Sequence, residues 1–135
     1  MEIIPEFGWI FYCGDMSELK RDKCGKWMYF FSDVDFAAEM CEKAVKENVV
    51  CEAKHTDDEN GVACFYLNCD DEERHKKILG FFIDNGLIRK TKTGKLYNIS
   101  FKFDNQTRAG EYGEEFESNI KLENFVDLQT GKWIR

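Results

Sequence analysis

The chain reads LYNISFKFDNQTRAGEY from Leu96 to Tyr112, and the first half of this stretch alternates strictly between apolar and polar residues. Successive side chains of a β-strand point to opposite faces, so the alternation predicts a strand over residues 97–104 with one aromatic buried face and one polar face. The residues expected to be buried are Tyr97, Ile99, Phe101 and Phe103. The turn that follows carries a hydroxyl, a guanidinium and a glycine. This combination suits an edge that binds an anion, and it equally suits a plain strand and turn with a solvated face.

The totals of the sequence predict one globular domain over residues 1–135. Hydrophobic residues make up 43% of the chain and charged residues 33%, which is typical of a folded domain with a hydrophobic core. The formal charge of −7 argues against duplex DNA as a partner, because binding to duplex DNA relies on Lys and Arg at the phosphates. No apolar run approaches the ~18 residues of a membrane helix, and no secretory signal is evident. We therefore expect a cytoplasmic protein without a membrane partner.

Six cysteines raise the question of disulfides or a metal site. No two of them are separated by only two residues, and no histidine lies at metal-ligand spacing from a cysteine pair. This favours reduced, buried thiols and no bound metal. The chain also lacks a glycine-rich phosphate loop and the motifs of serine and zinc hydrolases, so we expect no cofactor.

Hydrophobic periodicity predicts an α+β fold. Two apolar runs read as strands, an amphipathic helix follows with Ser32 or Asp33 as its N-cap, and a hairpin leads to a second helix capped by Asp70 or Asp71. The predicted strands span 8–13, 26–31, 49–56, 62–68 and 97–104, and the predicted helices span 34–47 and 72–85. The run at 26–31 reads as a central strand buried on both sides, and residues 114–130 fit a strand or a helix equally well. Short connections favour a mainly antiparallel sheet with two or three helices on one face.

One group of polar residues has a spacing that suits a ligand. If the strands at 49–56 and 97–104 present their polar rows on the same face, two ammonium groups, a guanidinium and a hydroxyl converge, as phosphate binding requires. The candidate ligand-binding residues are Lys54, Lys102, Asp104, Thr107, Arg108 and Tyr112. A solvated strand lysine is the alternative interpretation of Lys54.

The two histidines and a cluster of basic residues have structural interpretations. His55 shares the parity of the apolar residues of its strand and is expected to point inward. His75 fits either the core-facing side of its helix or a place at the surface or at a helix boundary. A basic cluster precedes the strand at 97–104 and suits either phosphate contact or a solvated turn. It consists of Arg89, Lys90, Lys92 and Lys95.

Four segments together resemble the Bles family, small uncharacterised proteins that share the fold of the eukaryotic mRNA cap-binding initiation factor. They are GKWMYFF (Gly25 to Phe31), AKHT (Ala53 to Thr56), CFYLNCDDEE (Cys64 to Glu73) and FKFDNQTRAGEY (Phe101 to Tyr112). The resemblance implies a curved antiparallel sheet with helices on its convex face. It also implies phosphothreonine lyase chemistry, in which Lys54 or Lys102 acts as the base and Arg108 as a phosphate ligand.

Three functions follow as expectations. The first is a small binding module that engages a phosphorylated ligand or a protein partner on the polar concave face of the sheet. The second is a phosphothreonine-lyase-like enzyme with a lysine base. The third is an acidic inhibitor that mimics nucleic acid.

Overall fold

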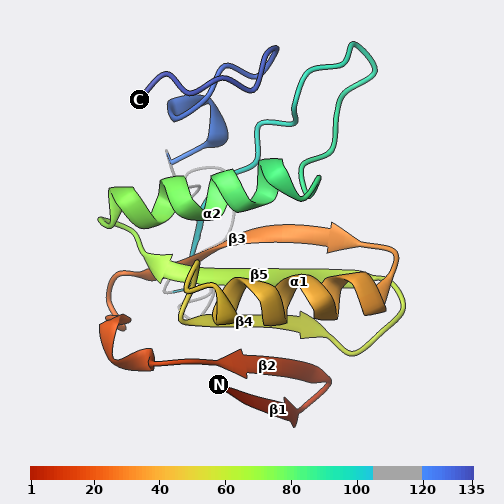
Figure 1. Ribbon diagram of the computed structural model, residues 1–135, viewed down its shortest axis with the longest axis vertical. Helices are drawn as coiled ribbons and strands as arrows, with labels where there is room; N and C mark the ends of the chain where they lie inside the picture. The colour runs from red at the N-terminus through yellow and green to blue at the C-terminus, as the bar shows by residue number, and fades with distance from the viewer. Residues whose placement is uncertain (105–119) are drawn as a thin grey trace.

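The computed structural model of the chain describes residues 1–104 and 120–135. These residues form an α+β fold, as the sequence predicts, with one open antiparallel sheet and two α-helices (Figure 1). The strands lie side by side in the order β1-β2-β4-β5-β3-β6. Their bounds are β1 Glu2–Glu6, β2 Trp9–Cys13, β3 Cys24–Phe31, β4 Glu52–Thr56, β5 Gly61–Asn68 and β6 Lys102–Phe103. The helices are α1 Val34–Lys46 and α2 Glu72–Asp84, and two short 3-10 turns, η1 Met16–Glu18 and η3 Leu122–Asn124, lie in the connections.

The predicted helices are confirmed, and their caps show why they begin and end where they do. The side chain of Asp33 accepts hydrogen bonds from two backbone N–H groups of the first turn of α1, and Asp71 accepts one from Arg74 N in α2. After α2 the chain turns at Gly86, whose φ of 70° is left-handed and favours glycine. The residues that α1 buries repeat at three and four: Ala37, Met40, Cys41, Ala44 and Val45.

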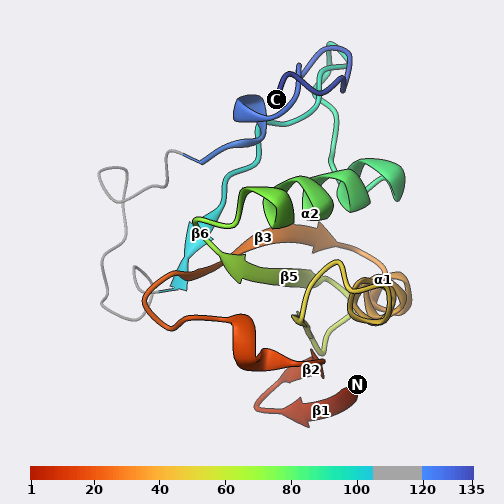
Figure 2. The same cartoon turned by 60° about the vertical axis from the view of Figure 1, so that its left-hand side comes forward.

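Both helices cover the same face of the sheet, and the core lies between. Phe65 of β5 contacts the rings of Phe81 and Phe82 in α2, and Trp27 of β3 packs against His75 of α2 and against Phe101. Trp27 and Phe65 are completely buried. The C-terminal residues lie on the side of α2 away from the sheet (Figure 2). No helix of residues 1–104 and 120–135 covers the opposite face of the sheet, which we call the helix-free face.

The strand at the N-terminus was not expected from the sequence. β1 and β2 form a hairpin whose two loop residues, Phe7 and Gly8, both have positive φ values of 51° and 81°. All five residues of β1 are exposed. Their sequence, EIIPE, also lacks the alternation of apolar and polar residues by which strands are recognised.

The prediction of one strand over residues 97–104 is wrong in its extent. Only Lys102–Phe103 pairs with β3 as a strand, and before it the extended chain changes partner repeatedly. Tyr97 N donates to Arg89 O, whereas Phe101 N donates to Ile120 O. The predicted burial holds for Phe101, but Tyr97 is 52% exposed.

Two smaller predictions are corrected, and the structure decides between two alternatives for a third residue. The strand predicted at 49–56 begins only at Glu52. The run at 26–31 is not buried on both sides, because Phe30 is 56% exposed on the helix-free face. For His75 the core-facing alternative is confirmed: its side chain is 2% exposed, because α2 lies against Trp27.

Candidate functional site

The helix-free face brings together charged and aromatic side chains from five strands. Register decides which residues share this face. Lys54 of β4 lies opposite Cys64 of β5, and Lys26 of β3 lies opposite both Tyr66 of β5 and Lys102 of β6. Paired residues of neighbouring antiparallel strands point to the same side, so these five side chains project from one face.

Three lysines form a cationic cluster on this face, which we call the lysine cluster: Lys26, Lys54 and Lys102. Lys26 and Lys102 are direct cross-strand neighbours. The ammonium groups of Lys26 and Lys54 both lie 5.7 Å from the centre of the Tyr66 ring, and so within twice that distance of each other. Three strand spacings separate Lys54 from Lys102, which corresponds to about 15 Å between their Cα atoms. A ligand that contacts all three cations therefore has to lie across Tyr66 and Cys64.

The thiol of Cys64 experiences the field of the whole lysine cluster. Burial raises the pKa of Cys64 to about 11, while the three lysines oppose this rise by stabilising the thiolate. Asp104 adds to the rise. The lysines thus create a local positive potential at the centre of the helix-free face, although the chain as a whole carries −7.

Lys54 is held against aromatic rings. Its ammonium group lies 4.1 Å from the centre of the Trp9 ring and 5.4 Å from that of Phe11, in addition to its contact with Tyr66. Ring faces attract cations, so this arrangement positions the ammonium group of Lys54. The role that the geometry supports for Lys54 is attraction of an anion.

Two carboxylates border the lysine cluster. Asp104 accepts a hydrogen bond of 2.7 Å from Lys26, and both side chains are largely buried, at 20% and 12% exposed. Glu52 lies on the same face of β4 as Lys54. Burial raises the pKa of Glu52, and Lys54 partly offsets this effect. The ion pair with Asp104 orients the side chain of Lys26. Lys54 and Lys102 form no ion pair within residues 1–104 and 120–135.

Neither histidine belongs to this face. His55 points inward, as predicted; its Nδ1 donates to the carbonyl of Thr56 and its Nε2 accepts from the hydroxyl of Tyr12. His75 Nδ1 accepts from the indole N–H of Trp27 at 3.0 Å, so Nε2 carries the proton and donates to Cys69 O at 2.9 Å. Burial lowers the pKa of His75. Both rings are structural, with each nitrogen committed to a hydrogen bond.

The remaining predicted site residues, Thr107, Arg108 and Tyr112, lie outside the described residues. Arg74, another possible phosphate ligand, is already engaged. Its guanidinium donates to the carbonyls of Asn48 and Val49 and pairs with Glu18, away from the lysine cluster.

Several members of the site were not predicted from the sequence, among them Lys26, Trp9, Phe11 and Tyr66. The signal that could have found Lys26 is its parity. It alternates with Trp27, so whichever face buries Trp27, Lys26 points to the other. Which lysine lies beside Lys102 depends on the pairing of β3 with β6, and that pairing has no local signature.

The comparisons with known proteins give no family, since no family model and no curated protein matches the chain. Within the described part of the chain, no group of three or more His, Cys, Asp or Glu side chains is arranged to hold a metal ion. Nor does any helix of residues 1–104 and 120–135 have the length and apolar composition to cross a bilayer.

Proposed function

We propose that the chain is a binding module whose helix-free face holds a phosphorylated ligand. The observation that carries this proposal is the lysine cluster, in which strand register gathers three ammonium groups around Tyr66 and Cys64. Lys54 and Lys102 supply charge for the phosphoryl oxygens, and Asp104 fixes the direction of Lys26. Trp9 and Phe11 provide apolar surface beside Lys54 for the body of the ligand.

The ligand class that we propose is a phosphorylated peptide. Phosphate carries close to two negative charges at neutral pH, which suits a cluster of several lysines. Two neighbouring carboxylates, Glu52 and Asp104, make the face less positive than duplex DNA binding requires. The Bles-like fold suggested by the sequence is consistent with this use of an open sheet face, and it remains part of the proposal.

Calorimetric titration with a phosphothreonine peptide and its unphosphorylated twin tests the proposal. The phosphopeptide should bind, and Lys54→Gln and Lys102→Gln should each weaken binding about tenfold, in keeping with the strength of charge-assisted hydrogen bonds. Lys46→Gln is the matched control, because it removes one exposed positive charge from α1 on the other face. Equal binding of the two peptides, or an equal loss in all three variants, would contradict the proposal.

The same samples distinguish binding from lyase chemistry. Mass spectrometry of the peptide after several hours should show the phosphothreonine intact. Loss of phosphoric acid that depends on Lys54 or Lys102 would instead identify a β-eliminating enzyme and replace the binding module with the second expected function.

A further inference from the structure

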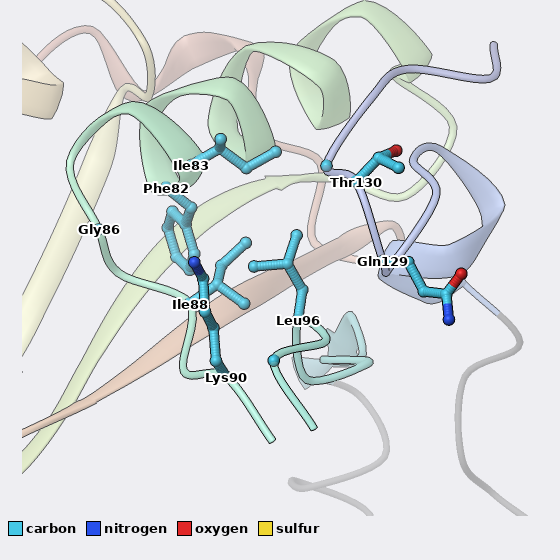
Figure 3. Close-up of a pocket in the computed structure, with 10 residues that line it drawn as sticks. Phe82, Ile83, Gly86, Ile88, Lys90, Leu96, Gln129 and Thr130 are labelled. Carbon is cyan, nitrogen blue, oxygen red and sulfur yellow. The ribbon is translucent and has the colours of Figure 1, made fainter. Parts of the chain in front are cut away.

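A pocket lies on the helix side of the sheet, at the C-terminal end of α2. Its walls come from α2, from the basic turn (residues 90–95) with the residues next to it, and from the C-terminal segment (Figure 3). Its volume of about 320 Å³ exceeds the space of a single bound water by an order of magnitude and lies at the lower end of the range of small-ligand pockets. It shares no residue with the lysine cluster.

The pocket has a mainly apolar lining and one exposed cation, Lys90. Phe82, Ile83, Ile88 and Leu96 contribute carbon surface from three segments, and Phe82 is completely buried. Lys90 lines the pocket as an exposed residue, whereas Gln129 and Thr130 form the far rim with their side chains turned away from it (Figure 3). An apolar cavity with one placed polar group is the usual form of a site for a small amphiphilic molecule.

The charge of Lys90 is not neutralised within the described part of the chain. No ion pair or hydrogen bond of its ammonium group occurs there. The carboxylate of Asp127 accepts hydrogen bonds from the backbone N–H groups of Gln129 and Thr130, which hold the rim in place. Lys92 and Lys95 follow Lys90 in the same turn, so the potential at the mouth of the pocket favours an anion.

We propose that this pocket binds a small amphiphilic carboxylate. The aromatic or branched aliphatic body of the ligand packs against Phe82, Ile88 and Leu96, and its carboxylate pairs with Lys90. The proposed carboxylate site gives the basic turn a role. The phosphorylated ligand proposed for the helix-free face does not contact this turn. The two proposals are independent, because they use different residues on opposite sides of the sheet.

Titration with 3-phenylpropionate, followed by the amide resonances of Gly86, Gly94 and Gly131, tests the proposal. These glycines line the pocket, and no residue that lines it belongs to the lysine cluster. Their resonances should shift in a saturable way with a dissociation constant on the order of 1 mM, as expected for a ligand of this size. The alcohol 3-phenylpropan-1-ol has the same body without the charge and should bind about fivefold more weakly.

Three variants separate the pocket from general charge. Lys90→Gln should weaken binding of 3-phenylpropionate about fivefold. Lys92→Gln, which removes a neighbouring charge that does not line the pocket, should leave binding within about twofold. Ile83→Trp should abolish the shifts by filling the cavity. Absence of glycine shifts in the wild type, equal binding of the alcohol, or equal effects of Lys90→Gln and Lys92→Gln would each overturn the proposal.

Discussion

Phe7 stands at a position that a bulky side chain rarely occupies. Its φ of 51° is left-handed, it is 92% exposed, and it forms the first loop residue of the two-residue hairpin between β1 and β2. Such turns prefer Asn-Gly, so the Phe-Gly of this chain gives no recognisable turn signal. The missing turn signal is one reason why the sequence did not predict this hairpin.

Replacing Phe7 tests this explanation. Phe7→Asn should raise the free energy of unfolding by about 1 kcal/mol, because asparagine tolerates the left-handed conformation. Urea denaturation followed by circular dichroism measures the change. Phe7→Leu keeps an ordinary side chain at the same φ and should leave stability nearly unchanged. A gain of equal size in both variants would show that exposure of the ring, and not backbone strain, is the cost.

His75 should make stability depend on pH. Its two hydrogen bonds, to the indole of Trp27 and to the carbonyl of Cys69, require the neutral ring. Its pKa in the folded protein lies below the ordinary value of 6.5, so the unfolded chain binds more protons at mildly acidic pH. The stabilisation is fully present above about pH 6.5 and is lost as the pH falls from there through the folded pKa.

The variant His75→Ala measures this contribution. It should destabilise the protein by about 3 kcal/mol at pH 7, because it leaves two buried polar groups without partners and opens a cavity. The difference in unfolding free energy between wild type and variant should shrink as the pH is lowered toward 5. A difference that stays constant with pH would mean that His75 titrates normally.

Among the elements, α1 shows how a cap is selected. Ser32 and Asp33 were equal candidates in the sequence, and the structure assigns the cap to Asp33, whose Oδ1 accepts from Asp35 N at 3.1 Å and from Phe36 N at 3.3 Å. Asp33→Ala should therefore lower the free energy of unfolding by about 1 kcal/mol. Ser32→Ala should have little effect in the same denaturation experiment. Comparable losses in both variants would contradict the assignment.

The segment 97–104 shows what alternation predicts and what it does not. Alternation predicted that Phe101 would be buried, and it is, against Trp27 and His75. It did not predict the partners of the backbone, which depend on residues distant in the sequence. β6 can lie close to β3 because residue 25 is glycine; a Cβ there would clash with the Phe101 ring and the carbonyl of Lys102. Periodicity therefore reports the environment of side chains, whereas pairing is decided by tertiary contacts.

For the whole molecule, the fold class could be predicted from local patterns, but the composition of the helix-free face could not. The sequence indicated a polar face with Lys54 and Lys102. The structure adds Trp9, Phe11 and Tyr66, because register places β2, β4 and β5 side by side. The mixture of rings and ammonium groups arises only when the strand order is known.

The six cysteines differ in how deeply the fold buries them. All are free thiols, and burial raises the pKa of Cys51 to about 12 and that of Cys64 to about 11. Cys13 and Cys69 are only partly buried. Thiolates react and thiols do not, so an aromatic disulfide reagent at pH 8 should label Cys13 and Cys69 first in the native protein. Peptide mapping checks the order, and early labelling of Cys51 or Cys64 would contradict the described packing.

The central claim is that the helix-free face binds a phosphorylated ligand, and Trp9 offers the most direct measurement. Its ring contacts Lys54 at 4.1 Å, whereas Trp27 is buried on the opposite face and serves as an internal control. In an NMR titration with a phosphothreonine peptide, the indole N–H resonance of Trp9 should shift to saturation while that of Trp27 stays in place. A Trp9 resonance that does not move, or that moves equally with the unphosphorylated peptide, would contradict the account.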